Sequence, residues 1–302
     1  MHTQGEPLLI PTRDGRRLFT MVLPGPARNG DLSENSANKP TVVFEAGSAA
    51  TRSTWALVQT KVAGFARAVV YDRAGLGRSG PDPTGRTLDR MADDLNDLLD
   101  GLGAGPFILV GHSAGGPIVR LAASRRPDRI AGLVLVDPTD EAADVLFGPI
   151  FRIGEKVVIS VESVLARLSL FERFFQNIGE VMPTDVREDL HREAFLPAVV
   201  TTQRQQARTF LTELRTWKAH PPRLPDVPVT VVSGGLAHGG DGIPRGIRAA
   251  ANASGAHRAA QSPQGRHVIA KKSGHYIPLT EPELIAEEIR RIIQPTDGEN
   301  AS

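Results

Sequence analysis

The stretch FILVGHSAGGPIVRLAAS, residues 107–124, determines how the rest of the chain is interpreted. It opens with the apolar run FILV, four strand-forming residues, and turns through the glycine-rich GHSAGG. Apolar residues at helical spacing follow, namely Ile118, Val119, Leu121 and Ala122. The pattern predicts a buried strand, a sharp turn and a helix, with Ser113 at the apex of the turn.

Each residue type in this turn has a physical reason. A serine hydroxyl is a weak nucleophile, so Ser113 must stand clear of the backbone, beside a base and beside amide donors. Gly111 and Gly115 relieve the crowding of a tight turn because they lack a Cβ, and Gly116 lets the helix pack close to the turn. The start of the helix leaves backbone N–H groups unpaired, which makes the Ala114 N–H a candidate donor to an oxyanion.

A Gly-x-Ser-x-Gly motif also arises by chance, as a glycine-rich turn with an exposed serine. Its place between a predicted strand and a predicted helix favours the other interpretation, a nucleophile elbow. In this context the chain resembles the α/β-hydrolase family from about Pro7 to Ile293. The resemblance implies an α/β fold: a mostly parallel eight-stranded sheet flanked by helices, with an inserted helical cap. It also implies an oxyanion donor, a serine, an acid and a histidine, in that order along the chain.

Length and composition narrow the class of protein. The 302 residues suffice for one large domain or a domain with an insertion. A net charge of +1 gives no electrostatic argument for nucleic acid or an acidic membrane surface. The absence of cysteine excludes disulfides and thiol chemistry. No apolar run approaches a membrane span and the N-terminus lacks the apolar core of a secretory signal, so we expect a cytoplasmic protein.

Short apolar segments that alternate with helical patterns predict the sheet. The turn Asp14-Gly15 predicts a hairpin between the first two strands. Thr280 and Glu283 form a capping-box pattern at the start of the last helix. The strands are expected at residues 7–10, 16–23, 41–44, 68–71, 107–110, 130–136, 227–233 and 266–270.

Other acidic residues are given structural roles. The loop that begins with Asp72-Arg73 resembles a D-x-x-G-x-G-x-S loop of the family, in which the carboxylate and hydroxyl satisfy loop amides. The helix predicted over 88–102 carries several aspartates, which the pattern assigns to a solvated face: Asp93, Asp94, Asp97 and Asp100.

The alternation of strands and helices stops between Thr139 and Leu224. This segment has a helical pattern and holds seven of the eleven phenylalanines. Members of the resembling family often carry a helical cap at this place, so we divide the chain into a core of residues 1–138 and 225–302 and a cap, or lid, of residues 139–224. The aromatic residues would hold the cap together. An apolar underside over a pocket would also favour a small, mainly apolar substrate.

The second oxyanion donor is sought in the loop after the strand at 41–44. In the resembling family this loop often reads His-Gly-x, and its backbone supplies the donor. Ala46-Gly47 stands at that position here, so the resemblance assigns the donor to the Ser48 N–H, beside that of Ala114. The alternative is an ordinary turn at the end of a strand.

Of the eight histidines, His275 lies where the resembling family places its catalytic base, after the last strand and just before the last helix. Imidazole can accept a proton from Ser113 and later donate it to a leaving group near neutral pH. The alternative is a surface-loop histidine. No spacing of His, Asp and Glu resembles a metal site, and the chemistry needs no cofactor.

Two residues compete for the role of the acid that orients His275. Most α/β-hydrolases place it shortly after the strand that corresponds to 227–233, where this chain offers only Asp241. Some members carry it at the end of the strand after the elbow helix, where this chain has Asp137. Strand ends are rigid, which favours Asp137. Either residue could instead have a structural role, Asp137 as a turn cap and Asp241 in a glycine-rich loop.

Together these features predict a serine hydrolase that cleaves an ester, thioester or lactone through an acyl-enzyme. Serine at the apex disfavours haloalkane dehalogenase and epoxide hydrolase chemistry, which uses aspartate there. The same triad could instead serve carbon–carbon hydrolysis, a lyase step or cofactor-free perhydrolysis, because the fold does not separate these reactions. A non-catalytic member that binds a ligand for signalling is a further alternative. The sequence does not identify the acyl group, the alcohol or the oligomeric state.

Overall fold

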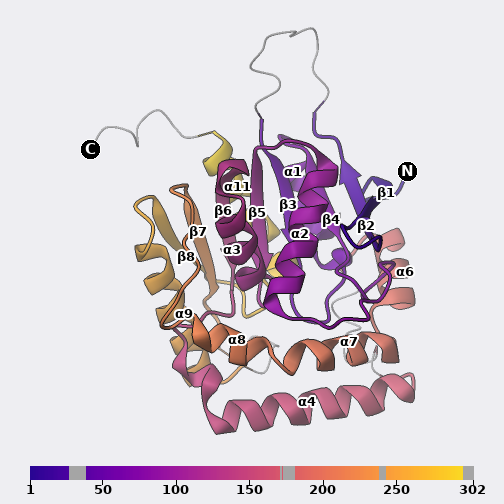
Figure 1. Cartoon of the computed structure of the whole chain (residues 1–302), viewed down its shortest axis with the longest axis vertical. Coiled ribbons are helices and arrows are strands. Elements are labelled where there is room, and N and C mark those ends of the chain that lie inside the picture. The colour runs from indigo at the N-terminus through magenta and orange to yellow at the C-terminus, as the bar shows by residue number, and fades with distance from the viewer. Residues whose placement is uncertain (27–38, 171, 173–180, 238–242, 295–302) are drawn as a thin grey trace, which may run out of the picture.

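The structure, a computed structural model, describes residues 1–26, 39–170, 172, 181–237 and 243–294. Its strands form one eight-stranded sheet in the order β1-β2-β4-β3-β5-β6-β7-β8 (Figure 1). β2 pairs antiparallel with both β1 and β4, whereas the remaining pairs are parallel, so the sheet is mixed but mostly parallel, as the sequence predicts. The strands are β1 (Glu6–Pro11), β2 (Arg17–Leu23), β3 (Thr41–Glu45), β4 (Ala68–Tyr71), β5 (Phe107–His112), β6 (Ile130–Val136), β7 (Val229–Gly234) and β8 (Gly265–Ala270).

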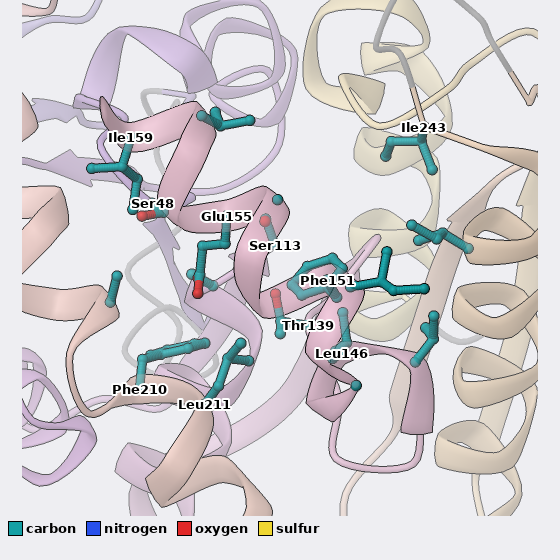
Figure 2. A pocket seen from close by; sticks show the side chains of 18 of the residues that line it. Ser48, Ser113, Thr139, Leu146, Phe151, Glu155, Ile159, Phe210, Leu211 and Ile243 are labelled. Atoms are coloured by element: carbon teal, nitrogen blue, oxygen red, sulfur yellow. The ribbon is translucent and has the colours of Figure 1, made fainter. Parts of the chain in front are cut away.

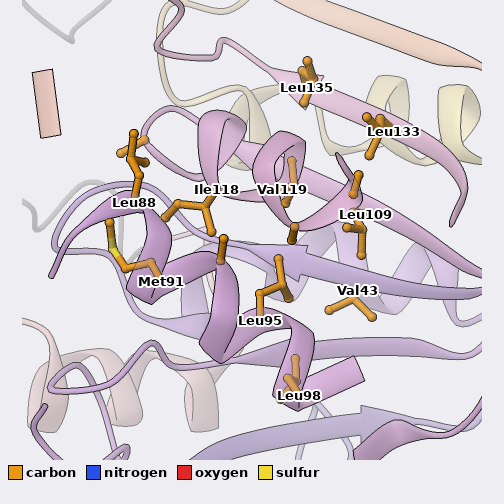
Figure 3. Packing of buried hydrophobic residues seen from close by; sticks show 14 of the residues in the cluster. Val43, Leu88, Met91, Leu95, Leu98, Leu109, Ile118, Val119, Leu133 and Leu135 are labelled. Carbon is orange, nitrogen blue, oxygen red and sulfur yellow. The ribbon is translucent and has the colours of Figure 1, made fainter. Parts of the chain in front are cut away.

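Helices cover both faces of the sheet, and the period-2 alternation of the strands divides the core between them. In β5, Leu109 faces α2 (Leu88–Leu102) and α3 (Gly115–Arg125), whereas Ile108 and Val110 face α1 (Ala56–Val62) and α11 (Pro282–Ile293). Figure 3 shows the first of these clusters, in which sheet residues pack against the apolar sides of α2 and α3. A further helix, α9 (Arg245–Ala260), packs on β7 and β8. This two-sided core fixes the strand ends that carry the candidate site.

The aspartates of α2 do not form a uniformly solvated face, which corrects the prediction. Asp94 and Asp97 are each only 7 % exposed. Arg16 donates to the Asp94 carboxylate, with Nη2 2.6 Å from Oδ1, and the backbone N–H of Arg13 donates to Asp97 at 2.8 Å. The β1–β2 hairpin folds over this side of α2, so arginines that are distant in sequence cover the carboxylates.

The capping box predicted at the last helix is also wrong. Thr280 ends the short helix α10 (Ile277–Thr280), and α11 begins at Pro282, because the residue before a proline is disfavoured in helical conformation. Glu281 instead accepts a hydrogen bond from the Ser273 hydroxyl at 2.6 Å, and Thr280 Oγ1 donates to the same Ser273 oxygen at 2.6 Å. These bonds fasten the ends of the loop that contains His275.

The segment between β6 and β7 is helical where it is described. It contains α4 (Pro149–Arg167), α6 (Thr184–Glu193), α7 (Pro197–Ala207) and α8 (Phe210–Thr216). In Figure 1, α4, α7 and α8 lie below the carboxyl ends of the parallel strands, with α4 outermost, and α6 lies at the side of the sheet. Within the described residues, no helix has the length and apolar character needed to cross a membrane.

A buried cluster of charges fastens α6 to the core. The Arg52 guanidinium is fully buried and donates to Asp72 at 2.5 Å, to Glu193 at 2.5 Å and to Asp189 at 2.6 Å. Asp72 also accepts the backbone N–H groups of Arg52 at 2.8 Å and Arg78 at 3.1 Å, so this carboxylate organises its loop. Breaking such a buried network by removing one member typically costs about 3–5 kcal/mol. The cluster therefore holds α6 firmly over the sheet edge.

Candidate active site

Ser113 lies at the turn between β5 and α3, in a backbone conformation that only a strongly constrained residue adopts. Its φ is 53°, in the left-handed region. Three hydrogen bonds hold this strained residue: its N–H donates to Val136 O, and its carbonyl accepts the N–H groups of Gly116 and Thr139, each at 3.0 Å. The constraint keeps the Ser113 side chain on the wall of a cavity.

The glycines of the turn are there because the surrounding atoms are too close for a Cβ. A Cβ on Gly111 would lie 2.6 Å from the Gly115 carbonyl oxygen, and one on Gly115 would lie 2.6 Å from the Glu45 carbonyl oxygen. A Cβ on Gly116 would lie 2.6 Å from Pro138 Cβ. The elbow is thus packed directly against the ends of β3 and β6.

His275 and Asp137 come together across 138 positions of the chain. His275 Nδ1 lies 2.6 Å from Asp137 Oδ2. The other carboxylate oxygen accepts hydrogen bonds from Arg248 Nη1 at 2.5 Å and from the Gly234 N–H at 3.2 Å. Asp137 directly follows β6, so the rigid sheet end holds the carboxylate in place.

Electrostatics keep Asp137 ionised. Burial alone would raise the pKa of its carboxyl, but the hydrogen bond and charge of His275, together with the Arg248 guanidinium, lower the pKa to about 2. A buried carboxylate beside the ring therefore remains negative at any pH at which the protein would work.

This depressed pKa predicts a contribution to acid stability. Because the folded pKa of about 2 lies below the ordinary value of 3.8, Asp137 stabilises the folded chain above pH 3.8 and loses this effect as the pH falls toward 2. Between pH 5 and pH 2 the native chain should lose about 2 kcal/mol of unfolding free energy that Asp137→Asn does not lose. Urea unfolding of both proteins across this range measures the difference. Parallel pH profiles would contradict the assignment.

His112 supports the loop that presents His275. Burial lowers the pKa of His112 to about 3, so its ring is neutral. His112 Nε2 lies 2.9 Å from the carbonyl oxygen of His275, and a carbonyl can only accept, so Nε2 carries the proton and donates. The two rings are also in contact, with centroids 4.6 Å apart.

Arg73 orients the loop that contains Ser48. Its guanidinium donates to the carbonyl oxygens of Ala46 and Gly47, each at 2.5 Å, and forms a buried ion pair with Glu45. In a planar trans peptide the N–H points opposite to the C=O. Because the Gly47 carbonyl is directed at Arg73, the N–H of Ser48 in the same peptide group is directed away from Arg73.

A model of the alpha/beta hydrolase family matches residues 42–288. The chain belongs to the α/β-hydrolase family. It is therefore a hydrolytic enzyme by family.

Individual relatives of this α/β hydrolase differ in reaction. An AB hydrolase superfamily protein of Gibberella zeae is 28 % identical over an alignment of 327 positions that covers 92 % of each chain. The solved esterase EaEST of Exiguobacterium antarcticum has a TM-score of 0.68 at 17 % identity, covering 95 % of this chain and 99 % of its own. The Cif epoxide hydrolase of Acinetobacter nosocomialis has a TM-score of 0.70 at 17 % identity, covering 97 % and 90 %. The shared fold thus accommodates different chemistry, so the reaction depends on the residues of the site.

Two chambers of this α/β hydrolase meet at Ser113. The larger, of about 920 Å³, is lined mainly by apolar side chains of the segment between β6 and β7, such as Phe151 and Phe210 (Figure 2). The smaller, of about 470 Å³, is lined by Ser113, His275 and the loop after β3. Ser48 and Ser113 belong to the walls of both.

The structure thus brings five predicted residues to one place. Ser113, Ala114 and Ser48 line the larger chamber, and the His275–Asp137 pair adjoins the smaller one. The alternative acid, Asp241, lies outside the described residues. Among these residues, no group of three or more His, Asp or Glu side chains is arranged to hold a metal ion.

Sequence reasoning did not find Arg248, the cation that contacts Asp137. It lies on α9, 111 positions from its partner. The sequence of this helix indicates an amphipathic helix and nothing about a contact with Asp137. No local motif could have identified it. Arg73 was assigned to a structural loop, but its contacts with the loop carbonyls could not be foreseen.

Proposed function

We propose that this α/β hydrolase is a serine hydrolase that cleaves an ester, thioester or lactone through the triad Ser113, His275 and Asp137. The observation that carries the proposal is the 2.6 Å contact between His275 Nδ1 and Asp137, beside a chamber whose wall includes Ser113 at the elbow. A serine, not an aspartate, occupies the apex, which favours an acyl-enzyme over an alkyl-ester intermediate.

The proposed reaction proceeds in two halves. Ser113 Oγ attacks the carbonyl carbon while His275 Nε2 accepts the hydroxyl proton; Asp137 on Nδ1 fixes the tautomer and stabilises the imidazolium. When the tetrahedral intermediate collapses, the bond to the leaving group breaks and His275 returns the proton to that group. Water then attacks the acyl-enzyme with His275 again as base, which releases the acid and restores Ser113.

We assign the oxyanion to the N–H groups of Ser48 and Ala114. Ala114 begins the turn into α3, where helical N–H groups lack helical partners. Because Arg73 donates to the Gly47 carbonyl, the Ser48 N–H of the same peptide group points away from Arg73. Ser48 also lines both chambers. A donor fixed in this manner before the substrate binds is what oxyanion stabilisation requires.

The two chambers suggest how a substrate lies. His275 must protonate the leaving group and lines the smaller chamber, so we place the leaving group there and the acyl group in the larger, apolar chamber. Residues 139–224 act in this proposal as the cap, since α4, α7 and α8 supply much of the larger chamber's wall. Its volume of about 920 Å³ suits a small organic acyl group.

Trapping the acyl-enzyme tests the function directly. Rapid mixing with p-nitrophenyl butyrate should release a burst of p-nitrophenol close to one equivalent per active enzyme if deacylation is slower than acylation. Acid quenching followed by peptide mass spectrometry should place one butyryl group on the peptide that contains Ser113. Ester turnover in which Ser113 never becomes acylated, under single-turnover conditions as well, would refute the mechanism. No ester turnover and no labelling of Ser113 by a fluorophosphonate would refute the function.

A further inference from the structure

The larger chamber is not uniformly apolar, because helices α4 and α7 of the proposed cap contribute polar side chains to its wall. Glu155 comes from α4 and Gln206 from α7, two helices that pack against each other. Figure 2 shows the Glu155 carboxylate pointing into the cavity that also contains the side chains of Ser113 and Phe210. Both polar groups therefore face the space that we assign to the acyl group.

Gln206 offers a hydrogen-bond acceptor that lacks a partner. Its side chain is 2 % exposed, and within the described residues its Oε1 accepts no hydrogen bond. Gln203, one turn earlier on α7, lines the same chamber, and its Oε1 is likewise buried without a partner there. Buried acceptors are normally satisfied, so a rotation that turns one of these oxygens into the chamber would let a ligand donor satisfy it.

Glu155 adds negative charge to this wall. Burial raises the pKa of its carboxyl above the ordinary value, and the nearby cations Arg152 and Lys156 offset only part of this rise. In the described part of the chain, its carboxylate makes no hydrogen bond or ion pair with another side chain. The surrounding wall is apolar and includes Ile159 and Leu211, so the carboxylate is the charged group that this part of the wall offers to a ligand.

We infer that the larger chamber selects acyl groups that combine an apolar chain with a terminal ammonium, which Glu155 and Gln206 accept as a hydrogen-bond donor. The apolar wall would hold the methylene groups of the chain. The carboxylate and the amide oxygen match a group that has several donors and a positive charge. This inference rests on the proposed function, and it names the substrate class as esters of ω-amino acids with aliphatic chains.

Paired substrates test the inference. We compare kcat/KM for p-nitrophenyl 6-aminohexanoate and p-nitrophenyl hexanoate, which differ by the terminal amine. The native enzyme should prefer the amino ester, and Glu155→Gln should reduce the ratio of the two values at least about tenfold, since it removes a charge-assisted bond. Glu188→Gln is the matched control: it removes the same charge from the exposed side of α6 and should leave the ratio unchanged. No preference in the native enzyme, or an equal fall of the ratio in the control, would overturn the inference.

A binding measurement separates this inference from the proposed function. Hexylammonium and 1-hexanol are titrated calorimetrically into Ser113→Ala, which needs no turnover. Hexylammonium should bind more tightly, and adding Glu155→Gln should remove the difference. If neither ester is hydrolysed and Ser113 is not acylated, the function fails while this titration still decides the selectivity. If hexanoate is hydrolysed through Ser113 but the amine gives no advantage in either assay, the function stands and the inference fails.

Discussion

Ser113→Ala should lower kcat/KM for p-nitrophenyl butyrate by a factor on the order of 10⁴ to 10⁶, because it removes the only atom proposed to form the covalent bond. His275 and the oxyanion donors stay in place, so only the slow attack of water would remain. The fold should persist. The three backbone hydrogen bonds of residue 113 do not involve its side chain, and alanine has the same strain at a φ of 53° as serine. We expect the free energy of unfolding to change by less than about 1 kcal/mol.

Ser124→Ala is the matched control for this experiment. Ser124 lies on the same helix, α3, and its hydroxyl donates to the Leu121 carbonyl at 2.8 Å, outside both chambers. It should retain native turnover. Hydrolysis by Ser113→Ala at the native rate, with the contaminating host esterases removed, would exclude the acyl-enzyme mechanism.

Local patterns were sufficient to predict the sheet and the elbow. The apolar runs at 68–71 and 130–136 coincide with β4 and β6, since a strand buried on both faces leaves a continuous apolar signal. The glycine contacts at the elbow follow from the same logic, because each depends on residues within a short turn and its neighbouring strands. The position of Asp137 was predictable as a candidate because a strand end is visible in the sequence.

Contacts between residues distant in the chain were not predictable. Asp94 and Asp97 have the spacing of exposed residues and become buried only because the hairpin covers them. Arg52 occupies an ordinary helix start, yet it is enclosed by carboxylates of α6 more than 130 positions away. A charged side chain has the same sequence signal whether it is solvated or paired across the fold. The sequence could therefore not show which charges fasten the proposed cap to the core, or that Arg248 contacts Asp137.

Asp137→Asn should lower kcat/KM by about 10⁴, through the tautomer of His275. The substituted amide can still accept the Arg248 hydrogen bond with its oxygen, which turns its NH₂ group toward His275 Nδ1. Nδ1 must then be an acceptor, so the proton of the neutral ring moves to Nε2. A ring protonated at Nε2 cannot accept the proton of Ser113. The loss should consequently appear in kcat while the chambers keep their shape.

Asp241→Asn is the comparison variant for Asp137→Asn. Asp241→Asn should change kcat/KM by less than about tenfold if Asp137 holds His275, since neither ring nitrogen then depends on residue 241. The opposite ranking would transfer the role of the acid to Asp241. Unfolding by urea must accompany both rates, because Asp137→Asn also leaves the buried Arg248 guanidinium without the full charge of its partner. If the loss of activity follows only the unfolded fraction, Asp137 stabilises the fold. If Asp137→Asn is fully folded and its chemical step is slow, the charge of Asp137 acts on the His275 imidazole.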